Sequence, residues 1–249
     1  MDSVVVAHTP LAPHAAPARI AFRTAGAGVA APLVILHGGW GYDMYPFDRQ
    51  VAAVSASRRV LIPDRSGYGH SPAVETLPAD FHDRAVDETV CVLDALALDR
   101  PVLWGHSDGA IIALRLALAR PDRVLAVIAE ATHFFRHKPS SDAFFDSVLA
   151  NPASTPIMRL HARAWLEIGA NAASPSDDFY DGRLGDLSAP TLLVHGGRDP
   201  RTEPGEIDAI RAAAPQIDIR VFASAGHSPH SEAASGDAVT AAAAGFLRA

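Results

Sequence analysis

The stretch "LWGHSDGAII", residues 103–112, places a serine between two glycines, directly after one apolar run and before another. If the first run is a strand and the second a helix, the turn between them is very sharp. Gly105 and Gly109 fit such a turn, because glycine lacks the Cβ that would clash where strand and helix crowd together. Ser107 would then stand at the apex, beside helix amides that favour developing negative charge. The stretch predicts a nucleophile exposed to a cleft.

Further apolar runs along the chain end in glycine or a turn, as buried strands of a parallel sheet do. Helical patterns lie between them. This alternation predicts an α/β fold, with a mostly parallel central sheet and helices on both faces. The strands are expected within residues 32–39, 58–67, 101–109, 123–131, 190–197 and 218–227, and the helices within 80–98, 109–119, 203–214 and 230–248.

The alternation breaks once, over residues 132–187, which hold aromatic, Ser, Asp and Pro residues and two short helical patterns. We expect a small helical cap inserted between two strands of the sheet. Residues 1–131 and 188–249 would form the core that carries it. Within the core, residues 8–17 are rich in Pro and Ala and are expected to form a loose arm.

Composition excludes several classes of protein. The 21 Lys and Arg are scattered and outnumbered by 28 Asp and Glu, so a nucleic-acid partner is not expected. The N-terminus does not resemble a signal peptide, and no apolar run reaches the roughly 18 residues of a membrane span. We expect a cytoplasmic protein that does not contact membranes. The single cysteine, Cys91, precludes an intrachain disulfide. The 12 His lack the spacing of a metal site, so no metal is expected. No cofactor is expected either.

Other strand ends carry the partners that a serine nucleophile needs. A serine hydroxyl requires a base, and an imidazole base requires a carboxylate that fixes its tautomer. Asp199 ends one strand in "VHGGRDP", and His227 follows the next in "SAGHSPH". The carboxyl ends of parallel strands meet at one edge of a sheet. Ser107, Asp199 and His227 are therefore predicted to form a catalytic triad, in the chain order expected of this architecture.

The glycine-rich turn "HGGW", residues 37–40, follows the first long apolar run. Such a turn lets a backbone N–H point into the cleft. The amide of Gly39, with that of Trp40 as the alternative, would pair with the amide of Asp108 as an oxyanion hole.

These motifs resemble the α/β-hydrolase fold superfamily over nearly the whole chain: "HGGWG", "PDRSGYGHS", "GHSDGA", "VHGGRDP" and "AGHSPH" match its oxyanion loop, post-strand turn, nucleophile elbow, acid and base. The chain is similar to the serine hydrolase branch with a small cap, including valacyclovir hydrolase-like enzymes, esterases and C–C hydrolases. Haloalkane dehalogenases and epoxide hydrolases place Asp at the apex, where this chain has Ser107. The resemblance argues against both.

The substrate pocket is expected to include Trp40, Asp108, Glu130 and Trp165. Asp108 has two interpretations: its side chain turns aside and benefits from the helix N-terminus, or it faces the pocket and pairs with a cationic group of the substrate. Glu130 is an alternative to Asp199 as the triad acid. His230 is expected on the surface at the last helix.

The resulting hypothesis is a serine hydrolase that cleaves a small carboxylic ester, lactone or related acyl compound through an acyl-enzyme, without a cofactor. The same triad can also serve a C–C bond hydrolase or a cofactor-free peroxidase-type enzyme. A ligand receptor with little turnover is the alternative from another class. The sequence predicts neither the acyl and leaving groups nor an oligomeric state.

Overall fold

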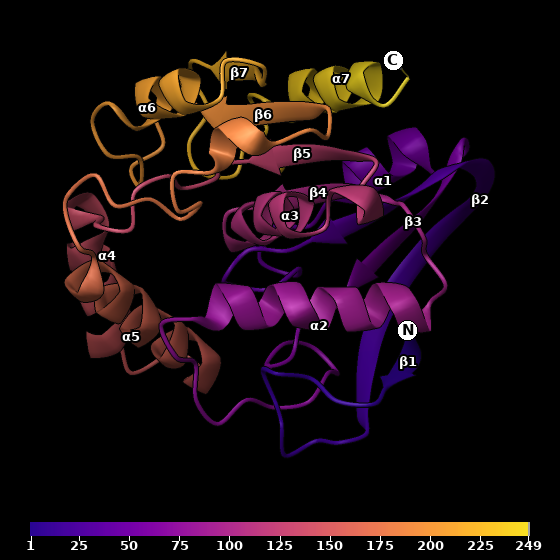
Figure 1. The fold of residues 1–249 in the computed structure, drawn as a ribbon, viewed down its shortest axis with the longest axis horizontal. Helices are drawn as coiled ribbons and strands as arrows, with labels where there is room; N and C mark the ends of the chain where they lie inside the picture. The colour runs from indigo at the N-terminus through magenta and orange to yellow at the C-terminus, as the bar shows by residue number, and fades with distance from the viewer. Residues whose placement is uncertain (249) are drawn as a thin grey trace.

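The computed structural model describes residues 1–248 and has a single seven-stranded sheet. Its strands run in the order β1-β2-β4-β5-β6-β7, with β3 paired to β2, and the neighbours from β4 to β7 are parallel. The prediction of a mostly parallel α/β sheet is confirmed (Figure 1). The strands are β1 (Asp2–Val6), β2 (Ala18–Leu36), β3 (Arg58–Pro63), β4 (Val102–His106), β5 (Ala126–Glu130), β6 (Thr191–Gly196) and β7 (Asp218–Phe222).

The long strand β2 reverses direction within its length. Leu61 of β3 pairs with both Thr24 and Val34, so β3 lies between the two halves of β2. The reversal occurs near Gly26, which has a φ of 75°. The second half of β2 runs parallel to β4 and brings the oxyanion-loop sequence to the same edge as the nucleophile elbow.

Helices cover both faces of the sheet (Figure 1). Consecutive residues of a strand point to opposite faces. Leu103 of β4 accordingly packs in the same core as the α2 and α3 side chains, and Trp104 packs with residues of α1 and α7. Two buried faces explain why the strand sequences are apolar at consecutive positions. The helices are α1 (Asp48–Val54), α2 (Phe81–Ala95), α3 (Asp108–Ala119), α4 (Pro139–Ala150), α5 (Pro156–Asn171), α6 (Glu206–Ala213) and α7 (Gly236–Phe246).

The prediction of a loose arm over residues 8–17 is wrong. Thr9 and Ala12 are fully buried, and the Thr9 hydroxyl donates to the carboxylate of Glu88 on α2. A Pro- and Ala-rich composition indicates a lack of regular structure. It does not indicate whether the segment packs against the core, as this one does through its small side chains and the hydrogen bond of Thr9 to α2.

Between β5 and β6 the chain leaves the sheet and forms α4 and α5, followed by a short 3-10 turn at Leu184–Asp186. Both helices lie beyond the carboxyl ends of the strands (Figure 1). This position places them over the edge where the predicted catalytic residues gather.

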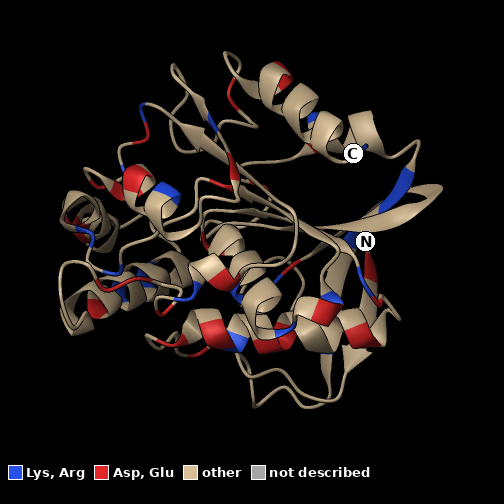
Figure 2. Cartoon of the chain, turned by 45° about the horizontal axis from the view of Figure 1, so that its top comes forward, with Lys and Arg blue, Asp and Glu red and all other residues tan. Residues whose placement is uncertain are grey.

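Charged residues are distributed over many elements. Figure 2 shows Lys and Arg interspersed with Asp and Glu along the helices. No helix within residues 1–248 is both long and apolar enough to cross a bilayer. Within the same residues, no group of three or more His, Cys, Asp or Glu side chains is arranged to hold a metal ion.

Candidate active site

Ser107 lies between the end of β4 and the start of α3, in a conformation that side chains rarely adopt, with φ 55° and ψ −120°. Such strain persists only where the surrounding structure enforces it. A Cβ on Gly105 would lie 2.0 Å from the carbonyl oxygen of Gly109, and one on Gly109 would lie 2.0 Å from the carbonyl oxygen of Leu36. The two glycines therefore allow strand, turn and helix to approach this closely.

The structure brings Ser107, His227 and Asp199 together. The Nε2 atom of His227 lies 3.1 Å from the Ser107 Oγ, and its Nδ1 lies 2.8 Å from the Asp199 Oδ2. Burial alone would raise the pKa of Asp199, but the hydrogen bond and charge of His227 outweigh it and lower that pKa to about 2. Asp199 is therefore a carboxylate at neutral pH and can hold the imidazole with its Nδ1 protonated.

Backbone contacts hold the two loops that carry Asp199 and His227. The amide of Arg201 donates to the Asp199 Oδ1 at 2.9 Å, and the ring of His106 donates to the carbonyl of His227 at 2.9 Å. A Cβ on Gly196 would lie 1.9 Å from the carbonyl oxygen of Gly226, so the loops after β6 and β7 cross in close contact.

Backbone donors lie on two sides of Ser107. The amides of Gly39, Trp40 and Asp108 have no hydrogen-bond acceptor among the described residues. The Tyr68 hydroxyl donates to the carbonyl of Gly39 at 2.7 Å, which fixes the peptide between Gly39 and Trp40. The arrangement leaves N–H groups available to a ligand, as an oxyanion hole requires.

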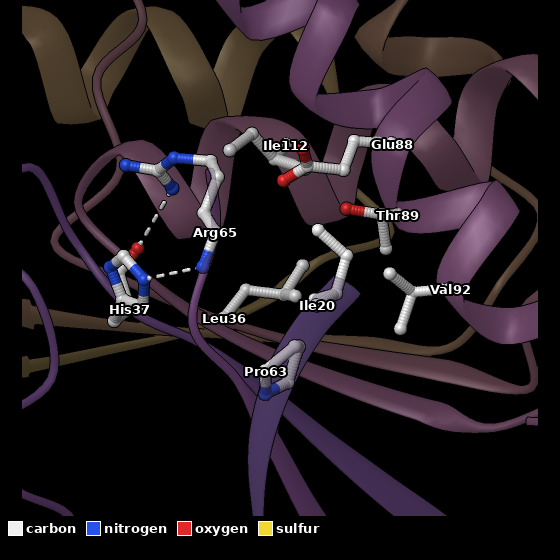
Figure 3. A pocket seen from close by; sticks show the side chains of 9 residues that line it. All are labelled: Ile20, Leu36, His37, Pro63, Arg65, Glu88, Thr89, Val92 and Ile112. Atoms are coloured by element: carbon white, nitrogen blue, oxygen red, sulfur yellow. Dashed lines mark hydrogen bonds between the residues drawn. The ribbon is translucent and has the colours of Figure 1, made fainter. Parts of the chain in front are cut away.

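His37 supports this loop from behind (Figure 3). Its Nδ1 donates to the carbonyl of Gly38 at 2.8 Å, and its Nε2 accepts from the amide of Arg65 at 3.1 Å. Burial lowers the pKa of His37 to about 3, so the ring stays neutral in the tautomer that these partners require. The Arg65 guanidinium also donates to the His37 carbonyl at 3.2 Å. Figure 3 shows these two residues at one side of a small cavity.

The side chain of Asp108 does not reach the pocket. Its Oδ1 accepts from His82 of α2 at 2.9 Å and from Trp165 of α5 at 3.1 Å, and its Oδ2 lies 3.0 Å from His161 of α5. Burial would raise the pKa of Asp108, but the charges and hydrogen bonds of His161 and His82 hold it well below its ordinary value. Of the two interpretations made from the sequence, the structure favours the side chain turned aside. It is held, however, by buried partners from two other helices rather than by the helix N-terminus alone.

Glu130 is also absent from the pocket lining. Its Oε1 accepts from the backbone and ring of His230 at 2.8 and 2.7 Å, and its Oε2 accepts from Trp104 at 3.2 Å. Burial would raise the pKa of Glu130, but His230 lowers it below the usual value. His227 is hydrogen bonded to Asp199 instead of Glu130. The expectation that His230 lies on the surface is wrong, because its ring is buried between Glu130 and Phe47.

A narrow pocket opens over Ser107. Trp40 and Trp165 line it, as expected for substrate-binding residues. Several polar residues that line the pocket were not predicted from the sequence, and among them only Arg201, two positions after the predicted acid, gave a usable signal. These residues are Tyr45, His106, His133, Ser141, His161 and Arg201.

A sequence model described as the alpha/beta hydrolase family matches residues 33–242. The chain belongs to this family. The match covers the turn at Ser107, the loops that carry Asp199 and His227, and the segment with α4 and α5.

Known relatives resemble parts of the chain. An epoxide hydrolase from Caballeronia sordidicola is 37% identical over 115 residues, 45% of this chain and 34% of its own length. The serine hydrolase BPHL of Mus musculus is 26% identical over 200 residues, 72% of this chain and 66% of its own length. A thermophilic esterase from Thermogutta terrifontis has the same fold, with a TM-score of 0.73 and 22% identity, covering 100% of this chain and 98% of the esterase. The alignments thus span about a third to two thirds of the two curated relatives.

Proposed function

We propose that the protein is a serine hydrolase that cleaves small carboxylic esters, lactones or related acyl compounds through an acyl-enzyme. The observation that carries this proposal is the continuous contact from Ser107 through His227 to Asp199, at 3.1 and 2.8 Å. A serine hydroxyl in contact with an imidazole whose other nitrogen is held by a buried carboxylate is an activated nucleophile. The family membership, the relative named a serine hydrolase and the fold shared with an esterase support the same reaction class.

The first half of the reaction forms the acyl-enzyme. The Ser107 Oγ attacks the substrate carbonyl carbon while His227 takes the hydroxyl proton, and Asp199 stabilises the resulting imidazolium. The tetrahedral oxyanion accepts hydrogen bonds from the amide of Asp108 and from that of Gly39, or of Trp40. His227 then gives its proton to the leaving alcohol. In the second half, water attacks the acyl group with His227 again as base, and the acid is released.

The nucleophile also separates ester cleavage from epoxide opening. A serine that opened an epoxide would form an ether with the substrate carbon, and water does not hydrolyse an ether under the same activation. A carboxylate at the apex forms an ester, which water can release. Ser107 therefore favours acyl transfer, although several relatives are named epoxide hydrolases.

We also propose residues 132–187 as the cap of this site. Trp165 and His161 of α5 and Phe145 of α4 line the pocket over Ser107. The segment would therefore shape the acyl and leaving groups that the enzyme accepts.

A panel of esters of increasing acyl length, assayed by product release, tests the proposal. We expect turnover by the wild-type protein and a loss on the order of 10⁶ in kcat for Ser107→Ala. Ser231→Ala, at an exposed serine, is the matched control and should retain activity. Near-normal turnover by folded Ser107→Ala, or no turnover of any acyl compound by the wild type, would contradict the proposal.

A further inference from the structure

The charged groups around the pocket are unbalanced. Among its lining residues is one arginine, Arg201, and none is aspartate or glutamate. The acid nearest to the reaction, Asp199, is already engaged by the ring of His227 and by the backbone amide of Arg201. Asp108 is enclosed by its three partners. Both carboxylates are therefore held by other groups, although their charges still act on Arg201, and Arg201 is the one Lys, Arg, Asp or Glu side chain of the described residues that lines the pocket.

The Arg201 guanidinium is positioned by aromatic rings. Its central carbon lies 4.0 Å from the centre of the Phe144 ring of α4 and 5.8 Å from that of the Trp40 ring. Stacking of this kind holds the plane of the guanidinium and leaves its N–H groups at the edge available for hydrogen bonds. No side-chain hydrogen bond or ion pair of Arg201 occurs among residues 1–248.

The Arg201 side chain is only partly buried, so an anion that bound it would exchange contacts with water for a charge-assisted hydrogen bond, which is stronger than a neutral one. Burial lowers the pKa of Arg201, yet an arginine side chain remains protonated at neutral pH. The planar fork of a guanidinium matches the two oxygens of a carboxylate. The Tyr45 hydroxyl and the ring of His133, which also line the pocket, could donate to the same group.

We propose that Arg201 binds a carboxylate of the substrate, so that the preferred substrates are esters or lactones carrying an anionic group, such as half-esters of dicarboxylic acids. This inference rests on the proposed hydrolase function. The pocket would then prefer an anionic substrate. The alternative made from the sequence, in which Asp108 binds a substrate cation, would give the opposite preference.

The test compares matched pairs of esters. Monoethyl glutarate carries a free carboxylate, and ethyl 4-carbamoylbutanoate is its neutral amide counterpart. 3-Acetoxypropanoate and its neutral counterpart 3-acetoxypropanamide place the charge on the alcohol side of the ester instead. We expect wild-type kcat/KM to favour the anionic member of at least one pair. Arg201→Gln should reduce that ratio roughly 10- to 100-fold, the range expected for a charge-assisted hydrogen bond.

Arg198→Gln is the matched control, because Arg198 is an exposed arginine in the same loop, and it should keep the wild-type ratio. A measurement on the wild type alone avoids any folding defect of the variants: glutarate should inhibit neutral-ester hydrolysis at least tenfold more strongly than glutaramide. Equal inhibition, or an unchanged ratio in Arg201→Gln, would overturn the inference while ester turnover still upheld the hydrolase function. Absence of all ester turnover would instead refute the proposed function, and this inference with it.

Discussion

Replacing Asp108 with alanine should destabilise the protein strongly, because this carboxylate joins three helices. The change would leave the Trp165 N–H and the His82 ring nitrogen facing a small cavity without their acceptor, and would remove the carboxylate oxygen that lies 3.0 Å from the His161 ring. These three side chains are nearly completely buried. A hydrogen bond to a charged group contributes about 1.5–3 kcal/mol, and one buried polar group left unsatisfied costs about 1–3 kcal/mol.

We therefore expect Asp108→Ala to lower the free energy of unfolding by about 3–5 kcal/mol, measured by urea denaturation. At about 2–4 °C per kcal/mol for a chain of this size, the melting temperature should fall by roughly 6–20 °C. Asp122→Ala, which removes an exposed aspartate, is the control and should change stability by less than about 0.5 kcal/mol. A loss below about 1 kcal/mol in Asp108→Ala would show that the carboxylate does not hold α2 and α5 against α3.

Three further predictions test the catalytic assignment, the buried histidines and the elbow. Asp199→Asn should lower kcat by roughly 10⁴ through loss of the correct imidazole tautomer, whereas Glu130→Gln should affect kcat far less; the reverse order in steady-state assays would identify Glu130 as the acid. His37 and His106 have folded pKa values of about 3 because of burial, so below pH 6.5 the unfolded chain binds protons that the folded chain does not. The free energy of unfolding should thus fall as the pH drops from about 6.5 toward 3, by roughly 1.4 kcal/mol per pH unit for each ring. A free energy of unfolding that stayed constant in urea titrations between about pH 6.5 and 4.5 would contradict this prediction. Gly105→Ala should abolish soluble folded protein, since its Cβ would meet backbone at 2.0 Å; a native melting curve would count against the elbow argument.

The sequence predicts what depends on local pattern. The elbow around Ser107 is encoded by two glycines at fixed spacing, and the position of Asp199 follows from a strand that ends beside it. His227 follows in the same way, because parallel strands deliver their carboxyl ends to one edge.

Contacts between distant segments were not predictable in the same way. Asp108 and Glu130 stand at strand or helix ends that face the cleft, and nothing local indicates that His82, His161 or His230 would enclose them. Whether a carboxylate faces a substrate or a buried histidine depends on how α2 and α5 pack, which the residue order does not specify.

Arg201 illustrates the same limit. Its position two residues after Asp199 is visible in the sequence, but its packing against the aromatic rings of Phe144 and Trp40 is not.

Covalent labelling of Ser107 tests the central claim most directly. The purified protein would be treated with a fluorophosphonate, which reacts with activated serines, and the modified peptide located by mass spectrometry. The account predicts one adduct per chain, on Ser107, formed by the native protein and absent from both Ser107→Ala and urea-unfolded protein. An adduct on another residue, or ester hydrolysis that persists in a protein whose Ser107 does not react, would contradict it.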